Sequence, residues 1–495
     1  MTLSGATTNV DSVPYSHIDL TSADDRITGA AQDELARSLA DLRVELELPA
    51  DFTDEVLEQA AEAVKAHTMP APDYTELPFV TIDPPGSTDL DQAVLIERAG
   101  SGYKVYYAIA DVPAFVHPGS SLDVETRRRG QTIYAPDSRI PLHPEVIGED
   151  AASLLPNQIR PAYVWEFELD GDGRVTATAL QRARIQSTAQ LTYEEVQKDI
   201  DAGTAPESLN LLKEVGKARI ALERARGGAS LALPEQEVEH DGYRYLINAR
   251  PPFEVENWNA QISLLTGMAA AELMLRGNVG ILRTMPPPDA DAISEYRQQT
   301  KALGNPWPED IPYGEYLRLL DTSDPKQLAL MFGAASLFRG AGYTPFDGEG
   351  PEERVQAAVA APYAHTTAPL RRLVDRFVLP ICEAIANDKE IPQWARQTLP
   401  ELPSLMASSD QLTARVERES LSAVEAAVMS SFVGDIFDAV VISTRNGTSG
   451  TIQIKEPPVT ARCEGKLTTG TTIRAELVRA DIAKREVLFK TVDAG

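Results

Sequence analysis

Asp83, Asp89 and Asp91 bring three carboxylates together directly after an apolar run, Phe79 to Ile82. At an effective dielectric constant of about 20, two carboxylates roughly 4 Å apart repel each other by about 4 kcal/mol. Such a group is stable inside a fold mainly when a cation lies among its members. Carboxylate ligands suit a hard cation such as Mg²⁺ or Mn²⁺, which also binds phosphates. The spacing predicts a divalent-metal site, with a plain acidic Asx turn as the alternative; an EF-hand is disfavoured because its Gly and closing Glu are missing.

The residues around these aspartates predict how they are positioned. The β-branched run before Asp83 is typical of a strand that ends there, and Pro84-Pro85-Gly86 predicts a turn. Asp89 and Asp91 are two residues apart, so in an extended segment both side chains point to one face. A strand end followed by a turn and a second strand would therefore present all three carboxylates together.

The chain resembles the ribonuclease II family, whose catalytic domain is called the RNB domain. The resemblance begins with Asp83-Pro84, Asp89-Leu90-Asp91 and the strand Tyr107 to Val112. Further segments follow in family order up to about residue 420: Pro118 to Asp123, Arg129 to Asp137, Ile140 to Pro144, Ser153 to Asn157, Leu191 to Val196, Glu272 to Asn278, Tyr363 to Arg372 and Val416 to Glu419.

This resemblance implies a hydrolytic exoribonuclease that degrades single-stranded RNA from its 3′ end and releases nucleoside 5′-monophosphates. Asp83, Asp89 and Asp91 would hold divalent metal, Mg²⁺ with Mn²⁺ as a substitute, on either side of the scissile phosphate. Asp89, Asp91 and Arg371 would be the catalytic residues, with Arg371 stabilising the charge of the transition state.

The same resemblance assigns substrate contacts. Tyr134 would stack on the terminal nucleotide, Glu272 and Glu417 would contact its ribose, where a 2′-hydroxyl marks RNA, and Arg372 would assist substrate binding. Taken alone, each of these residues is more often structural than functional. His365 is interpreted as a neighbour of the site rather than a catalytic base.

Gln92 departs from the family pattern Asp-Leu-Asp-Asp, whose last Asp is a metal ligand. A glutamine still offers a carbonyl oxygen to a cation but no charge, so we expect weaker metal binding or a preference for Mn²⁺. The segment Leu231 to Glu235 also lacks the family's second stacking aromatic. These departures leave open an RNA-binding or regulatory protein with weak or absent catalysis, and, as a remote alternative, a scaffold with structural Ca²⁺.

The net charge of −28 over 495 residues conflicts with a nucleic-acid partner, because such affinity comes largely from neutralised phosphates. The conflict is smaller if RNA enters an internal channel where local arginines set the potential. The candidate clusters are Arg127-Arg128-Arg129 and Arg371-Arg372 with Arg376, with a solvated charged face as the alternative for the first.

Targeting signals and cysteine chemistry point to the cytoplasm. Residues 1 to 20 lack the basic and apolar regions of a secretory signal. The apolar stretch Ile262 to Leu282 contains Glu272, Arg276 and Asn278, which predicts a buried helix and no membrane span. Cys382 and Cys463 are far apart, so neither a zinc site nor a disulfide framework is expected. No obligate protein partner is inferred.

The pattern of elements predicts an α+β chain. Residues 1–74 should contain a disordered start and a small helical domain compatible with a helix-turn-helix, with helices from Ala23 to Glu47 and from Thr53 to His67. By the resemblance, residues 75–432 should form the RNB catalytic domain, β-rich at first, with predicted strands such as Tyr103 to Ile109 and Val164 to Leu169. Its second part is helical, with helices at Ile262 to Leu282, Arg371 to Ala386 and Gln411 to Val433.

Residues 433–495 predict a five-stranded OB-fold barrel that binds single-stranded RNA. The predicted strands are Ala439 to Ser443, Gly450 to Ile454, Thr472 to Leu477 and Val487 to Phe489, with a turn at Asn446-Gly447. Because tandem cold-shock barrels and a Lys-rich tail are not recognisable, we expect the chain to stall near RNA duplexes.

Overall fold

The computed structural model describes residues 29–231, 235–240, 245–250, 252–322, 324–445, 447–454 and 459–492. The predicted disordered start, residues 1–20, lies outside them. The first residues of the helix predicted from Ala23 also lie outside.

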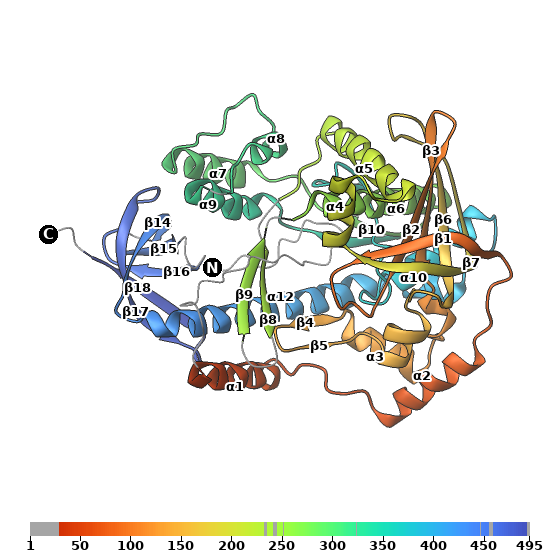
Figure 1. The fold of residues 1–495 in the computed structure, drawn as a ribbon, viewed down its shortest axis with the longest axis horizontal. Coiled ribbons are helices and arrows are strands. Elements are labelled where there is room, and N and C mark those ends of the chain that lie inside the picture. The colour runs from red at the N-terminus through yellow and green to blue at the C-terminus, as the bar shows by residue number, and fades with distance from the viewer. Residues whose placement is uncertain are drawn as a thin grey trace.

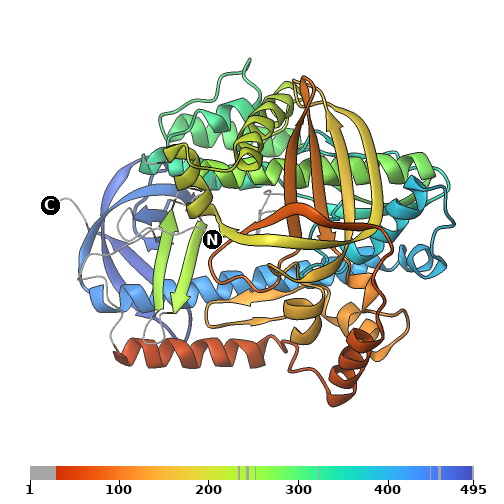
Figure 2. The same cartoon turned by 45° about the vertical axis from the view of Figure 1, so that its right-hand side comes forward.

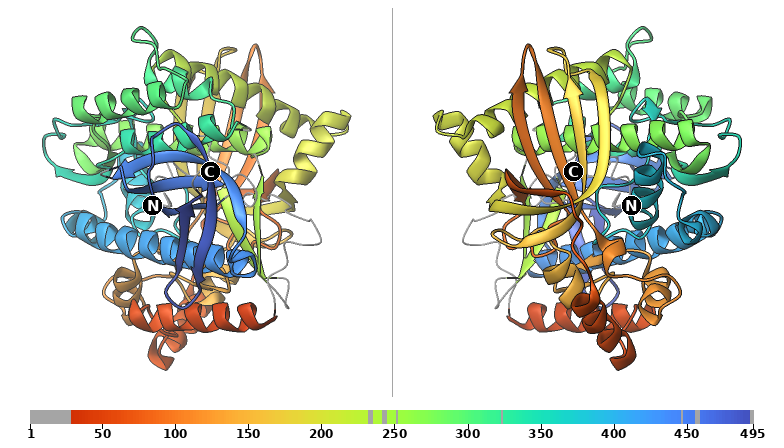
Figure 3. Two further views of the ribbon diagram at one scale, coloured as in Figure 1. Left: turned by 90° about the vertical axis from the view of Figure 1, so that its left-hand side faces the viewer. Right: turned by 90° about the vertical axis from the view of Figure 1, so that its right-hand side faces the viewer.

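A closed five-stranded barrel forms the β-rich part of the chain (Figures 1 and 3). Its strands follow the order β1-β2-β3-β6-β7, with the bounds β1 Asp73–Asp83, β2 Gln92–Ala99, β3 Gly102–Ala110, β6 Ile159–Leu169 and β7 Val175–Thr192. Neighbouring strands are antiparallel, except that β1 and β7 close the barrel in parallel and pair Asp83 with Thr192. The strand predicted to end at Asp83 is confirmed.

Helices cover this barrel and fill the middle of the chain, as predicted. Their bounds are α4 Tyr193–Ala202, α5 Glu207–Ala225, α6 Glu254–Gly277, α7 Ala290–Ala302, α8 Tyr313–Arg318, α9 Pro325–Gly333, α10 Asp375–Ala386, α11 Gln393–Thr398 and α12 Leu402–Met429. Short two-stranded sheets connect them: β4 Ile133–Ala135 with β5 Ser138–Ile140, β8 Glu235–His240 with β9 Tyr245–Arg250, β10 Val279–Thr284 with β11 Gly342–Asp347, and β12 Val355–Gln356 with β13 Ala361–Pro362.

Three predicted helices have boundaries that differ from those of the structure. The helix predicted to continue to Leu282 ends at Gly277, because Asn278 takes the left-handed conformation with φ 55° and the chain continues as β10. The helix predicted from Arg371 begins at Asp375, after a turn. The helix predicted over Gln411 to Val433 is α12, which begins earlier, at Leu402.

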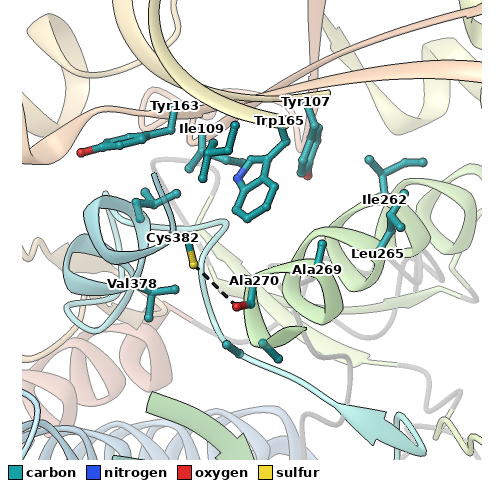
Figure 4. Close-up of a cluster of buried hydrophobic side chains, with 14 of the residues drawn as sticks. Tyr107, Ile109, Tyr163, Trp165, Ile262, Leu265, Ala269, Ala270, Val378 and Cys382 are labelled. Carbon is teal, nitrogen blue, oxygen red and sulfur yellow. Dashed lines mark hydrogen bonds between the residues drawn. The ribbon is translucent and has the colours of Figure 1, made fainter. Parts of the chain in front are cut away.

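The main core lies between the barrel and the helices α6 and α10. Figure 4 shows Trp165 and Ile109 of the barrel facing Ala269 of α6 and Cys382 of α10. The Cys382 thiol donates a weak hydrogen bond to the carbonyl of Ala270 at 3.6 Å. This packing fixes the barrel strands that carry the aspartates relative to the segment that precedes α10.

A second closed barrel forms the C-terminal part of the chain and follows the long helix α12 (Figures 1 and 2). Its order is β14-β15-β16-β18-β17, with the bounds β14 Ile436–Arg445, β15 Ser449–Ile454, β16 Thr460–Glu464, β17 Thr472–Asp481 and β18 Glu486–Thr491. The five-stranded barrel is confirmed, although β16 was not among the predicted strands. Asn446, half of the predicted turn, lies outside the described residues.

The two N-terminal helices, α1 (Gly29–Glu45) and α2 (Asp54–Ala66), are present as predicted, and Thr53 caps α2 through Val56 N. They pack on different partners. Helix α1 lies along α12 (Figure 2), whereas α2 lies against α3 (Ser121–Arg129) and the helical turn η2 (Val146–Ala151). This differs from a helix-turn-helix, in which the two helices pack on each other.

Neither cysteine forms a disulfide, and both are buried. Within the described part of the chain, no helix combines the length and the apolar character that crossing a membrane requires.

Candidate active site

The aspartate loop, residues 83–91, connects β1 to β2 and is fixed by the segment that follows η2. Leu90 N donates to Ser153 Oγ at 2.9 Å, and Leu154 N donates to the Leu90 carbonyl at 3.0 Å. The Asp91 carbonyl accepts from Ala110 N at 2.9 Å. Since both sides of the loop are hydrogen bonded, its carboxylates have defined positions before any ligand arrives.

Burial destabilises the ionised form of the Asp83 and Asp91 carboxyl groups. Asp83 Oδ2 is buried and has no hydrogen-bond partner among the described residues. Desolvation, together with the charge of Asp89, raises the pKa of Asp83 to about 7, although Arg371 opposes the shift. Desolvation also raises the pKa of Asp91 well above its ordinary value, against the opposing effects of Arg371 and Leu370 N. The structure therefore brings Asp83, Asp89, Asp91 and Arg371 into one electrostatic group.

Asp89 is held by the hairpin β4–β5. Its Oδ2 accepts from the Tyr134 hydroxyl at 3.0 Å, and its Oδ1 accepts from Arg139 Nη1 at 3.1 Å. Tyr134 and Arg139 face each other across the hairpin, and Arg139 also pairs with Glu149. Arg139 was not predicted from the sequence. The strand pairing of the hairpin could have identified Arg139, because that pairing places residue 139 opposite the predicted Tyr134.

The arginine loop, residues 365–373, carries Arg371 to Asp91. Between Tyr363 and Cys382 every described residue is buried except Arg371, whose side chain is 16% exposed. Its Nε lies 3.6 Å from Asp91 Oδ2. The predicted catalytic arginine is thus the accessible side chain of an otherwise buried segment.

Hydrogen bonds with three other segments fix the backbone of the arginine loop. The Leu370 amide donates to Asp91 Oδ1 at 2.7 Å, and the Arg371 carbonyl accepts from Thr132 N at 2.9 Å. The Pro369 carbonyl accepts from His143 Nε2 at 3.1 Å. Burial lowers the pKa of His143 to about 3, so its ring is neutral. Burial likewise lowers the pKa of His365 well below its ordinary value, which does not suit a proton-accepting role that titrates near neutrality.

Arg372 and Gln92 have surroundings that differ from their predicted roles. Arg372 is buried, and its Nε and Nη2 donate to the two carboxylate oxygens of Asp375 at 2.5 and 2.8 Å. Gln92 Nε2 donates to the Thr367 carbonyl at 2.6 Å, and its Oε1 accepts from the Tyr107 hydroxyl at 3.0 Å. Both side chains therefore make hydrogen bonds to other residues of the protein.

The two predicted ribose contacts come from different helices. Glu272 is exposed on α6, and Glu417 is half-buried on α12. Their roles toward a ribose stay predictions.

The carboxylates suit a hard divalent cation by their donor chemistry. The buried, unpartnered oxygen of Asp83 is the kind of atom that a cation satisfies. In this conformation no three acidic, histidine or cysteine side chains of the described residues are close enough to share one ion. Arg139 and Arg371 instead provide the positive charge beside Asp89 and Asp91.

Comparison with known families accounts for most of the chain. Residues 72–387 match the RNB domain, and residues 435–492 match the RNase II-type exonuclease C-terminal S1 domain.

Individual relatives agree with this match. Ribonuclease R of Escherichia coli is 31% identical over 341 residues, which cover 64% of this chain and 40% of the relative. The exosome complex exonuclease RRP44 homolog A of Arabidopsis thaliana is 27% identical over 379 residues, covering 69% of this chain and 38% of the relative. The chain thus spans well under half the length of these curated relatives.

Solved structures share the fold. The apo form of Mycoplasma genitalium RNase R aligns with a TM-score of 0.82 at 19% identity, covering 93% of this chain and 78% of that one. Yeast Ssd1, described as a pseudonuclease, aligns with a TM-score of 0.64 at 16% identity, covering 86% and 53%. Since the RNB match covers more than half of the sequence, the chain belongs to the RNB-domain family and carries an RNase II-type S1 barrel behind that domain.

Proposed function

We propose that this chain is an exoribonuclease that hydrolyses single-stranded RNA from its 3′ end and releases nucleoside 5′-monophosphates. The observation that carries the proposal is the pairing of Asp91 with Arg371, the accessible side chain of the buried arginine loop. An arginine fixed beside a carboxylate cluster suits a phosphodiester, because its planar donors match phosphate oxygens while the carboxylates recruit cations.

The residues of the site have separate roles in this proposal. Asp83, Asp89 and Asp91 would hold a divalent cation, Mg²⁺ or Mn²⁺, which when bound supplies positive charge at the scissile phosphate and activates water. Arg371 would donate to the phosphate oxygens and stabilise the charge that develops there. Tyr134 would stack on the terminal base.

The remaining residues would act on the substrate or on the loop. Glu272 and Glu417 would accept hydrogen bonds from ribose hydroxyls, as RNA selectivity requires. Arg372 would act through the arginine loop, since its guanidinium is committed to Asp375.

Charge distribution and relatives support an RNA substrate. Residues 433–495 carry nine Lys and Arg against eight Asp and Glu, so nearly all of the net charge of −28 lies in the preceding residues. A nearly neutral S1 barrel can approach RNA where the acidic remainder would repel it. Mycoplasma genitalium RNase R has been solved with ribose-methylated single-stranded RNA and with double-stranded RNA.

We propose domain limits of 1–74, 75–432 and 433–495 for this arrangement.

The second candidate is an RNA-binding or regulatory protein with weak or absent catalysis. Gln92 favours it, because this position lacks the carboxylate of the family pattern and is hydrogen bonded within the protein. Ssd1 illustrates that the fold occurs in a pseudonuclease.

One assay separates the two candidates. The purified protein is incubated with 5′-labelled single-stranded RNA in Mg²⁺, Mn²⁺ or EDTA, and the product ladder is followed with time. Stepwise shortening from the 3′ end and release of 5′-monophosphates support the exoribonuclease. RNA that is bound but uncleaved in both metals supports the second candidate.

Asp91→Asn supplies the active-site control for this assay. It should abolish cleavage and leave RNA affinity largely intact, because it removes charge at the site and no distant contacts. Asp172→Asn, a change in an exposed turn, should leave the ladder unchanged. Full activity of Asp91→Asn would contradict the site.

A further inference from the structure

We propose that Gln92 is a positioning residue that fixes the arginine loop, and hence Arg371, through its side-chain amide. This inference rests on the proposed function, and it replaces the expectation that Gln92 is a weakened metal ligand. The positioning role differs from a metal-ligand role because it requires a hydrogen-bond donor at position 92.

The orientation of Gln92 is defined by partners on both sides. Its Nε2 donates to the Thr367 carbonyl at 2.6 Å, and its Oε1 accepts from the Tyr107 hydroxyl at 3.0 Å. The Tyr107 oxygen lies 2.8 Å from Ser263 Oγ, a buried group on α6. Because the Thr367 carbonyl only accepts, the flipped amide would lose this bond, although its NH₂ group could still donate to the Tyr107 hydroxyl.

Gln92 acts beside Asp91 on the same short segment. Asp91 Oδ1 accepts from the Leu370 amide at 2.7 Å, while Gln92 donates to the Thr367 carbonyl three residues earlier. Two consecutive residues at the start of β2 thus hold both ends of the Thr367–Leu370 segment. Arg371 follows this segment directly, so its position depends on both contacts.

The chemistry of the contact explains why an amide is required. An ionised carboxylate at position 92 could accept from Tyr107 but could not donate to the Thr367 carbonyl, which would lose a partner in a buried segment. It would also add a negative charge next to the buried carboxyl group of Asp91. A metal-ligand role needs Gln92 Oε1, and that atom already accepts from Tyr107.

Two substitutions at this position give opposite rank orders under the two hypotheses. Gln92→Met keeps the volume and removes both hydrogen bonds, whereas Gln92→Glu keeps the acceptor and replaces the donor with charge. A positioning role predicts that kcat falls about 10-fold in Gln92→Met and about 100-fold in Gln92→Glu at saturating metal. A ligand role predicts that Gln92→Glu is at least as active as the original chain and that Gln92→Met is the weaker variant.

Two further measurements accompany kcat. In Gln92→Met the KM for RNA and the Mn²⁺ affinity, measured by calorimetry without RNA, should stay within about twofold of the original values, because neither the RNA contacts nor the carboxylates change. Gln327→Glu, in α9, is the matched control and should leave all three values unchanged. A Mn²⁺ affinity that rises about tenfold in Gln92→Glu overturns the proposal.

A double-mutant cycle tests whether Gln92 acts through Arg371. In an Arg371→Ala background, Gln92→Glu should reduce the residual rate by less than about twofold. If the fold-reductions in rate of the two single variants multiply in the double variant, the proposal is overturned.

Amide hydrogen exchange separates this inference from the proposed function, since it needs neither RNA nor activity. Peptides that cover residues 365–373 should exchange faster in both Gln92 variants than in the original chain and in Gln327→Glu, by a larger factor than peptides of the C-terminal barrel. If the original chain fails to cleave RNA but this difference appears, the exoribonuclease proposal fails and the loop contact stands. Unchanged exchange would overturn the inference whatever the activity.

Discussion

Asp83 is the carboxyl group of the site that receives the least hydrogen bonding, because its Oδ2 is buried without a partner in the described part of the chain. Its pKa is raised to about 7 from an ordinary 3.8. Between these pH values the folded chain keeps a proton that the unfolded chain has lost. The stability of the metal-free protein therefore falls as pH rises through this window, by at most about 4 kcal/mol.

This fall in stability with rising pH gives a first prediction. In EDTA, Asp83→Asn should raise the thermal unfolding midpoint more at pH 8 than at pH 5, because an amide cannot ionise. Saturating Mg²⁺ should reduce the gain, since a cation would stabilise the ionised Asp83. Differential scanning fluorimetry of both proteins measures this, with Asp172→Asn as control. An equal gain at both pH values would contradict the pKa of Asp83.

Arg139 gives a second prediction, because it occupies Asp89 Oδ1 while Tyr134 occupies Oδ2. A cation at Asp89 must compete with this guanidinium. Arg139→Gln should therefore tighten Mn²⁺ binding by about threefold to tenfold, measured by calorimetry without RNA. Arg174→Gln, which removes an exposed arginine paired with Asp172, should have no effect. Unchanged Mn²⁺ affinity in Arg139→Gln would show that the cation does not contact Asp89.

The elements show how α1 connects the two halves of the chain. Leu35 and Leu39 of α1 pack with apolar residues of α12 and with Ile482 of the S1 barrel. Ser38 Oγ donates to the Ile482 carbonyl at 3.0 Å, and Glu45 pairs with Arg485 at 2.9 Å. Helix α1 thus contacts the helix that leads into the barrel and the turn between β17 and β18.

A third prediction follows at this scale. Leu35→Asp places a carboxylate in this buried contact, and it should speed amide exchange around Ile482 and weaken RNA binding several-fold. The rate on a short RNA at saturating concentration should change little, because the aspartate and arginine loops are untouched. Arg37→Asp, an exposed change on the same helix, is the control. Equal exchange in all three proteins would show that α1 does not hold the barrel.

The sequence predicts strands better than it predicts loops. Strands such as β3 follow from β-branched and aromatic runs, whose propensity and burial agree. Strand β16 was missed because Thr460–Glu464 is short and alternates with polar residues. The end of α6 was mispredicted although Gly277-Asn278 is a recognisable cap signal. The contact of Gln92 with Thr367 could not be predicted, because a hydrogen bond between segments 275 residues apart leaves no periodic pattern.

For the whole molecule, a nearly neutral S1 barrel, residues 433–495, follows a strongly acidic remainder of the chain. Several of the barrel's cations already face acidic residues: Lys490 pairs across the sheet with Glu464 and Glu476, and Arg479 bonds Glu486 at 3.0 Å. These cations of the described part of the barrel are partly neutralised before any phosphate approaches. Base stacking and contacts near the site must then supply much of the affinity for RNA.

This distribution gives a fourth prediction. The affinity of Asp91→Asn for a labelled 20-nucleotide RNA should fall only weakly with salt, with a slope of log K against log salt of magnitude about 2 or less, equal to about three phosphates. Fluorescence anisotropy between 50 and 300 mM KCl measures the slope. A magnitude above about 5 would mean that a basic surface dominates binding.

The bonds that fix the arginine loop also set when during synthesis the site can form. Asp91 and Leu370 are 279 residues apart, and Gln92 and Thr367 are 275 apart. Such contacts are the slow steps of folding, because long loops must close before the contacts stabilise them. A ribosome-bound chain that has emerged only as far as β13 holds its aspartates without its arginine. The proposed active site therefore cannot form until almost all of the RNB domain has been made.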